Sequence, residues 1–307
     1  MRLCIVIVNY QTPRLVLDCL DSLEGQVEAG LDEIVVVDNA SGDGSAEQIE
    51  RGISARGLLR CCRVVRSDKN VGYAAGNNLG IRAVDANYYL LLNSDTIVRK
   101  GAVHALLAQM QEHPFAGIAG PRLESADGTP QISCFRDLTP VSELLSAAKT
   151  GPLSALLRDF EVALPVANDA CEAEWVSFAC VLIRREVIEK VGLLDEGYFM
   201  YFEDSDYCRA ARATGFRVWY FPDAHVVHLR GGSTEARQKN AERQRPPRYM
   251  YASRTRYYRK GYGALGVLAA NALWCVGRGI AWSQGKVAAT RERQWLDNWT
   301  DAFRPQL

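Results

Sequence analysis

The stretch LCIVIV at residues 3–8 is a continuous run of apolar side chains, most of them β-branched. A helix-like segment begins after Thr12-Pro13, and a second apolar run, EIVVVDN, occupies residues 33–39. Apolar runs that do not alternate with polar residues indicate strands buried on both faces, which is typical of parallel strands covered by helices. The order strand, helix, strand therefore predicts an α/β fold.

The same unit recurs further along the chain. CRVVRS at residues 62–67 and YYLLLNSD at residues 88–95 are predicted strands, with a helix between them at about residues 74–83. Two of the strands end in polar side chains: Asp38, Asn39, Asn93, Ser94 and Asp95. Ligands of open α/β sheets bind beyond the carboxyl ends of the strands, so these groups should converge there with Asn9 and Tyr10. For any single group, ordinary turn chemistry is the alternative explanation.

Composition narrows the class of protein. The chain has 307 residues, 48% of them hydrophobic, which is enough for one large core or two modest ones. Lys plus Arg equals Asp plus Glu at 36 each, so no overall field draws the chain to nucleic acid. Nine cysteines without metal-ligand spacing, and an amino terminus that turns polar too soon for a signal peptide, predict a reducing, cytosolic setting.

The segment SDKNVGYAAGNNLG at residues 67–80 contains two glycines that favour ligand binding. Gly72 and Gly76 permit close approach of the backbone to a ligand, and the following helix offers unpaired N–H groups to phosphate. The segment is neither a Walker loop nor a full dinucleotide fingerprint. Alone, it is a weak indication.

The segment GYFMYFEDSDYCRAARATG at residues 197–215 sets three carboxylates behind a run of aromatic side chains. Acidic residues are favoured in the first turn of a helix, and Gly215 is a plausible helix end. On these residues alone, a structural role and a catalytic role for Glu203, Asp204 and Asp206 both stay open.

Six segments in order carry a specific resemblance: VIVNYQT (6–12), VVDNASGDGS (36–45), NVGYAAGNN (70–78), LLLNSDT (90–96), FMYFEDSDYCRAARATG (199–215) and HVVHLRGGST (225–234). Over about the first 235 residues the chain resembles a family 2 glycosyltransferase of the GT-A fold, in its bacterial rhamnosyltransferase-like branch. The resemblance implies a Rossmann-like mixed sheet flanked by helices. It also implies a catalytic domain at 1–232, with a nucleotide-sugar half at about 1–120 and an acceptor half at about 121–232. A basic, aromatic and helical extension is then expected at 233–307.

By this resemblance, the residues that bind the nucleotide-sugar would be Asn9, Tyr10, Asp38, Asn39, Gly72, Asn77, Asn93 and Asp95. Asp38 would accept a hydrogen bond from the ring N–H of the base. NSDT resembles the DxD-type element with Asn93 in its first acidic place, so Asp95 is the expected carboxylate ligand of Mn²⁺ or Mg²⁺. His228 resembles the late metal ligand of the family, and imidazole suits Mn²⁺ better. The alternative for His228 is a packed histidine, and His225 is expected to be structural.

The ED pair resembles the catalytic acidic element of the family. Asp204 would be the general base that deprotonates the acceptor, and Glu203 would support it or contact the acceptor. Asp206 is expected to pair with Arg209 or Arg212. An apolar stacking wall would stand before the pair, made of Phe199, Tyr201 and Phe202.

The acceptor segment WVSFACVLIRREVIEKVGLLDE at residues 175–196 departs from the family pattern. Phe178 stands where the family usually has glycine, and its ring would narrow the acceptor pocket or fill it differently. Trp175 is either a residue that stacks on an acceptor sugar or a core tryptophan.

The tail combines charge and apolar residues. Residues 230–260 hold ten Lys or Arg against two Glu, and ALGVLAANALWCV at 264–276 is apolar but shorter than the roughly 20 residues of a spanning helix. We therefore expect no membrane span. Contact with an anionic membrane surface is one prediction. The other is packing on the catalytic domain or a second subunit, through residues such as Leu265, Leu268 and Leu273.

Together these features predict an inverting, metal-dependent glycosyltransferase on the cytoplasmic side of the cell membrane, as a soluble or peripheral protein. It would move rhamnose from dTDP-rhamnose to a hydroxyl of a glycan or lipid-linked acceptor in cell-surface polysaccharide synthesis. Inversion is expected because the matched motifs hold one base and no second nucleophile. The alternative is a nucleotide-sugar binding protein or a nucleotidyltransferase. The latter is disfavoured because VNYQTPRL at residues 8–15 is not a glycine-rich, lysine-bearing loop.

Overall fold

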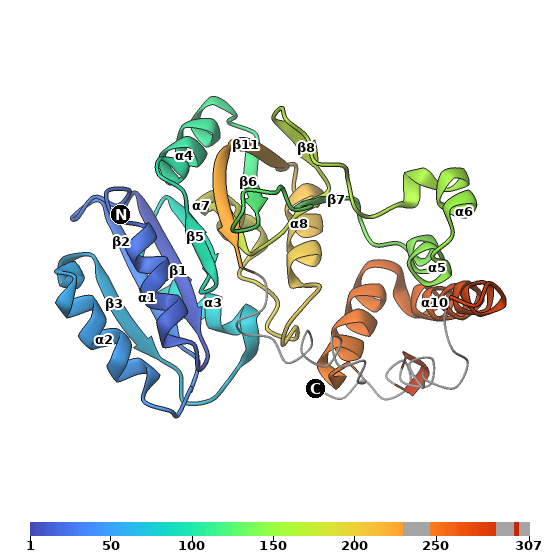
Figure 1. The fold of residues 1–307 in the computed structure, drawn as a ribbon, viewed down its shortest axis with the longest axis horizontal. Coiled ribbons are helices and arrows are strands. Elements are labelled where there is room, and N and C mark those ends of the chain that lie inside the picture. The colour runs from blue at the N-terminus through green and yellow to red at the C-terminus, as the bar shows by residue number, and fades with distance from the viewer. Residues whose placement is uncertain (230–245, 287–297, 301–307) are drawn as a thin grey trace.

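The computed structural model describes residues 1–229, 246–286 and 298–300 (Figure 1). Its strands are β1 (Leu3–Asn9), β2 (Asp32–Asp38), β3 (Cys62–Arg66), β4 (Tyr88–Asn93), β5 (Thr96–Val98), β6 (Ala116–Glu124), β7 (Cys134–Phe135), β8 (Cys171–Ala173), β9 (Trp175–Val176), β10 (Cys180–Arg184) and β11 (Arg217–His228). Its helices are α1 (Pro13–Ser22), α2 (Ser45–Ala55), η1 (Leu58–Arg60), α3 (Gly72–Ala83), α4 (Ala102–Glu112), α5 (Pro140–Ala148), α6 (Gly151–Leu156), η2 (Arg158–Phe160), α7 (Arg185–Val191), α8 (Glu203–Ala213) and α10 (Arg248–Ser283).

A nine-stranded mixed sheet forms the centre of the described chain, in the order β3-β2-β1-β4-β10-β6-β11-β5, with β8 also paired to β11. β1 runs parallel to β2 and β4, and β2 runs parallel to β3. β10 is antiparallel to both β4 and β6, which makes the sheet mixed. The expected α/β architecture and the four parallel strands of the first half are therefore confirmed.

Both faces of β1 are buried, as the unbroken apolar run predicts. Ile5 and Ile7 pack on one side of the sheet with Val16 of α1. Val6 packs on the other side with Ala74 of α3. Burial of each such side chain contributes roughly 1.5–3 kcal/mol, so these two helices are held on opposite faces by the alternate residues of one strand.

Helices α5, α6 and α10 lie together at the side of the molecule away from β1, β2 and β3 (Figure 1). α10 bends at Gly263, whose φ of 68° is not helical, so residues 248–262 and 264–283 form two parts. The second part packs against α5 at very short range. A Cβ added at Gly277 would lie 2.5 Å from the Leu144 carbonyl oxygen, so small side chains set this contact.

The packing face expected for the tail is wrong at two of its three leucines. Leu265 is 79% exposed and Leu268 is 38% exposed, while Leu273 is half-buried and Val267 and Ala270 are buried. The reason is that α5 approaches residues 264–283 so closely that only small residues fit between the two helices. This part of α10 therefore packs through small residues and leaves two leucines exposed.

The apolar run counted against a membrane span is only part of a longer helix. The count stops at Gly277, but the helix continues through it to Ser283. By length and composition alone α10 could cross a membrane, and so could a helix that packs inside a soluble protein. The predicted boundary at 232/233 falls in 230–245, outside the described residues.

Candidate active site

A pocket of about 530 Å³ lies beyond the carboxyl ends of β1, β2 and β4. Its lining consists of Val8, Tyr10, Asn39, Asn70, Gly72, Tyr73, Asn93, Ser94, Ser177, Phe178, Ala179, Phe199, Met200, Tyr201, Glu203, Asp204, His228 and Tyr249. Groups separated by more than a hundred residues therefore share one cavity. Four of the seven residues expected to converge belong to it: Tyr10, Asn39, Asn93 and Ser94. Asn9, Asp38 and Asp95 are buried outside its lining.

Asn9 and Asp38 are buried beside this pocket rather than in its lining. Asn9 is fully buried, and its Nδ2 donates to Asp38 Oδ1 at 2.7 Å and to Ser41 Oγ at 3.0 Å. Asn9 Oδ1 accepts from the backbone N–H of Thr12 at 3.1 Å. The side chain of Asn9 is thus occupied in holding Asp38 and the turn after β1. This arrangement differs from the direct contact with a nucleoside that the resemblance implies for Asn9.

Gly72 is needed because its backbone lies against the backbone of Phe199, a contact that the sequence does not reveal. Its φ is +82°, and an added Cβ would lie 2.2 Å from the carbonyl oxygen of Phe199. Asn39 fixes the same loop, since its Oδ1 accepts from Val71 N at 3.1 Å. Asn77 is 1% exposed and donates to Tyr73 O at 2.9 Å, so it lies inside α3 and not in the pocket lining.

Asp95 and His228 come together although 133 positions separate them. β11 pairs antiparallel with β5 and places His228 opposite Thr96, which brings His228 Nε2 to 3.4 Å from Asp95 Oδ1. His228 Nδ1 is buried with no hydrogen-bond partner among the described atoms. In the described part of the chain no cluster of three or more His, Cys, Asp or Glu side chains could hold a metal. His225 contacts Glu124 Oε2 through Nδ1 at 3.2 Å, which agrees with a structural role.

The acidic pair begins α8 after a strained turn. Tyr201 and Phe202 both have positive φ, 69° and 70°, a conformation that costs a non-glycine residue roughly 1–3 kcal/mol. The turn directs Glu203 and Asp204 into the pocket lining. Asp204 Oδ1 accepts from the backbone N–H of Ser205 at 2.8 Å, and Glu203 Oε2 is buried without a partner among the described atoms.

Burial raises the pKa of both carboxyl groups of the acidic pair above that of an exposed carboxyl group. It raises the pKa of Asp204 to about 6. Burial and the charge of Asp204 raise the pKa of Glu203 well above its usual range. With a pKa of about 6, Asp204 is ionised at neutral pH and can accept a proton.

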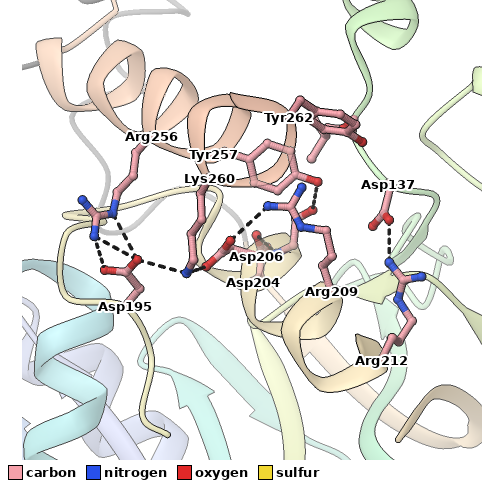
Figure 2. A network of polar contacts seen from close by, with 12 residues as sticks. Asp137, Asp195, Asp204, Asp206, Arg209, Arg212, Arg256, Tyr257, Lys260 and Tyr262 are labelled. Atoms are coloured by element: carbon pink, nitrogen blue, oxygen red, sulfur yellow. Dashed lines mark hydrogen bonds and ion pairs between the residues drawn. The ribbon is translucent and has the colours of Figure 1, made fainter. Parts of the chain in front are cut away.

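Asp206 faces away from the pocket and toward α10 (Figure 2). It contacts Arg209 at 3.2 Å, as expected, and Lys260 at 2.5 Å, a partner that the sequence did not reveal. Arg212 instead pairs with Asp137 at 2.5 Å. The three acids of this segment thus divide into two in the pocket lining and one in a structural ion pair.

Of the two aromatic residues considered for the acceptor side, Trp175 and Phe178, only Phe178 lines the pocket. Trp175 stacks on Phe135, with ring centroids 4.0 Å apart, and its Nε1 donates to Arg136 O at 2.8 Å. It does not belong to the pocket lining, so the alternative of a packed tryptophan describes it. The buried ring of Phe178 packs edge to face on the ring of Tyr207, with the ring centroids 6.3 Å apart.

Comparison with known proteins gives the family. The model described as "Glycosyl transferase family 2" matches residues 4–155. The amino-terminal half of the chain belongs to this family. Most of the strand-end groups described above, from Tyr10 to Ser94, lie within the matched residues.

Two curated relatives extend beyond this half. The low-salt glycan biosynthesis hexosyltransferase Agl10 of Haloferax volcanii is 26% identical over 230 residues, which are 74% of this chain and 66% of that protein. The N-acetylglucosaminyl-diphospho-decaprenol L-rhamnosyltransferase of Mycobacterium tuberculosis is 28% identical over 221 residues, 66% of this chain and 67% of that protein. The chain thus spans about two thirds of the length of these relatives.

A solved structure establishes the fold. The mannosyltransferase PcManGT from Pyrobaculum calidifontis, in complex with GDP-Man and Mn²⁺, superposes with a TM-score of 0.62 at 14% identity, over 100% of this chain and 88% of that one. This family 2 chain therefore has the GT-A fold, as expected.

Sequence reasoning missed two aromatic residues of the pocket, Tyr73 and Tyr249. Tyr249 opens α10 and lines the cavity, with its ring 5.2 Å from Phe199 and 6.3 Å from Tyr201. The available signal for Tyr249 is the mixture of tyrosines and basic residues at 248–263, which predicts membrane contact or packing but no place in the pocket. Part of the carboxyl-terminal extension thus belongs to the candidate active site.

Proposed function

We propose that the protein is an inverting, metal-dependent glycosyltransferase that moves a sugar from a nucleotide-sugar to a hydroxyl group. The observation that carries this proposal is the place of the acidic pair, at the start of α8 and in the lining of the pocket beyond the strand ends. Burial raises the pKa of Asp204 to about 6. A base with a pKa near the working pH is well suited to remove a proton from an attacking hydroxyl.

In the proposed reaction Asp204 takes the proton of the acceptor hydroxyl. The acceptor oxygen forms a bond to the anomeric carbon while the bond from that carbon to the nucleoside diphosphate breaks, so the configuration is inverted. Glu203 donates a hydrogen bond to the acceptor or the sugar. The aromatic side chains Phe199 and Tyr201 line this end and offer an apolar face to a sugar ring.

Asp95 and His228 fit the role of metal ligands. Their donor atoms lie 3.4 Å apart, and one carboxylate with one imidazole leaves the remaining positions to phosphate oxygens and water. Such a set suits Mn²⁺ better than Mg²⁺. The bound metal would neutralise the charge that builds up on the departing diphosphate.

The donor is proposed to be dTDP-rhamnose, and the acceptor a glycan or lipid-linked saccharide for cell-surface polysaccharide. Support comes from the mycobacterial relative, whose name specifies L-rhamnosyl transfer to N-acetylglucosaminyl-diphospho-decaprenol. Tyr10 and Asn39, with Asp38 behind them, would hold the nucleoside. The proposed setting is the cytoplasmic face of the membrane, where Leu265, Val276 and Trp282 of α10, each at least 54% exposed, would contact lipid.

A hydrolysis screen tests the proposal. The protein is incubated with Mn²⁺ and dTDP-rhamnose, UDP-glucose, UDP-N-acetylglucosamine or GDP-mannose, and the release of nucleoside diphosphate is measured without acceptor. We expect dTDP-rhamnose to be hydrolysed fastest. Preference for another donor would refute the rhamnosyl assignment alone. Release of nucleoside triphosphate on addition of pyrophosphate, without hydrolysis, would favour a nucleotidyltransferase.

A further inference from the structure

The strained turn at Tyr201 and Phe202 needs support from outside, because isolated non-glycine residues do not hold a left-handed conformation. One support comes from α3. The backbone N–H of Tyr73 donates to Phe199 O at 2.7 Å, and Gly72 allows that close approach. This contact fixes the beginning of the turn but not the residues that follow it.

The second support comes from residues 248–262 of α10. Ser253 is 1% exposed, and its Oγ donates to Met200 O at 3.0 Å, in the middle of the turn. The fully buried ring of Tyr257 packs against Phe202 at 5.6 Å. The same tyrosine accepts a hydrogen bond from Ser205 Oγ at 3.1 Å. Contacts from α10 therefore lie on both sides of the acidic pair along the chain.

An outer set of charges holds α10 in this place (Figure 2). Lys260 bridges Asp195 at 3.1 Å and Asp206 at 2.5 Å. Arg256 pairs with Asp195 at 2.7 Å. The guanidinium of Arg209 lies over the ring of Tyr257 at 4.2 Å. These contacts join α10 to α8 and to the segment before the turn, so the inner hydrogen bonds keep their geometry.

We infer that residues 248–262 of α10 are a positioning element of the active site, which acts through Ser253 and Tyr257 to keep the turn strained and Asp204 directed into the pocket. The catalytic role of this element rests on the proposed function, in which Asp204 is the general base. The placement of the turn is a structural property, and it can be measured without any substrate.

The test is a titration of the full-length protein by carbon NMR, with the carboxyl carbons of Asp and Glu labelled. Asp204→Asn and Glu203→Gln assign the two signals. In the wild type Asp204 should titrate at about 6. Ser253→Ala and Tyr257→Phe should each lower that midpoint by about one unit, because a relaxed turn lets the carboxylate gain water. The other titratable side chains of the pocket lining, Tyr10, Tyr73, Glu203, His228 and Tyr249, are unchanged in Ser253→Ala and Tyr257→Phe.

Two matched variants serve as controls in the same helix. Ser283→Ala removes a hydroxyl that donates to Ile280 O, and Tyr262→Phe removes one that donates to Leu138 O, both away from the turn. They should titrate like the wild type. Ser253→Ala and Tyr257→Phe should also lower the rate of donor hydrolysis about tenfold, with nucleotide affinity unchanged.

Wild-type titration of Asp204 in folded Ser253→Ala and Tyr257→Phe would overturn the inference, and so would an equal shift in the controls. Thermal unfolding of each variant establishes that it is folded. If the wild type hydrolyses no nucleotide-sugar, the proposed function fails, while the titration still decides whether α10 positions the turn.

Discussion

At the scale of single residues, Asp204 is both the proposed general base and a buried carboxyl group whose ionisation lowers the stability of the fold. The variant Asp204→Asn should lose glycosyl transfer and keep nucleotide affinity, because a general base acts on the transition state and contributes little to ground-state binding. Isothermal titration with dTDP and a transfer assay measure the two properties. Transfer at the wild-type rate would eliminate Asp204 as the base.

The raised pKa of Asp204 also predicts how stability depends on pH. The folded protein binds this proton more tightly than the unfolded chain, so the wild type loses stability as pH rises from the ordinary range of an aspartate to about 6. Asp204→Asn has no charge to bury and should therefore melt at a higher temperature than the wild type at pH 7.5. The difference should shrink at pH 4. A lower melting temperature for the variant at pH 7.5 would contradict this explanation.

The metal prediction concerns Asp95 and His228. Each of Asp95→Ala and His228→Ala should raise the Mn²⁺ concentration needed for half-maximal turnover by tenfold or more, since each removes a proposed ligand. EDTA should stop the wild type, and added Mn²⁺ should restore it. His225→Ala is the control, because His225 pairs with Glu124 instead. Full turnover in EDTA would refute the metal assignment.

At the scale of elements, a buried ion pair joins α5 to α10. Arg254 Nε lies 2.9 Å from Glu143 Oε1, with both side chains at most 10% exposed. Glu143→Ala leaves the guanidinium buried without its carboxylate and should lower the free energy of unfolding by about 3–5 kcal/mol in urea. Glu172→Ala breaks an exposed pair with Arg217 and should cost about 0–1 kcal/mol. Equal losses would show that the burial of the first pair does not matter.

The elements also show how far sequence reasoning reaches. β1 to β4 were predictable because a buried strand carries its signal within a few neighbouring residues. The contact between α5 and α10 was not, since it depends on small residues such as Gly277, which give no apolar period. The residues of the candidate site also differ in whether a local sequence pattern marks them. Asp204 and His228 followed from motifs, but Lys260 reaches Asp206 across 54 positions, and no local pattern marks that pair.

At the scale of the whole molecule, the basic residues at 230–260, together with the exposed apolar side chains of α10, predict binding to an anionic membrane. The full-length protein should co-sediment with vesicles of phosphatidylglycerol and phosphatidylcholine at low salt. It should dissociate as salt shortens the screening length from about 10 Å at 0.1 M to about 3 Å at 1 M. Vesicles of phosphatidylcholine alone should bind less.

A matched pair of leucine variants distinguishes binding through the exposed face of α10 from nonspecific adsorption to vesicles. Leu265→Ser should weaken vesicle binding, since Leu265 is 79% exposed on α10. Leu59→Ser changes a leucine that is 68% exposed on η1 and should bind like the wild type. η1 follows α2, which lies on the opposite side of the molecule from α10 (Figure 1). Absence of binding to acidic vesicles at low salt would remove the membrane role. A dimer in solution would then be the occupant of this face.

The glycine at position 72 has a consequence for recombination between related enzymes. Its backbone touches Phe199, and neighbouring residues of α3 also bond to the later half, Tyr73 to the Phe178 carbonyl and Asn78 to Leu194. The amino-terminal half of the pocket and the half that carries the acidic pair are therefore fitted to each other along α3. A chimera that takes its first 120 residues from a relative inherits the chemistry of Asp204 only if the donor sequence also has glycine there. The unit that can be exchanged is therefore the whole pocket, and not either of its halves.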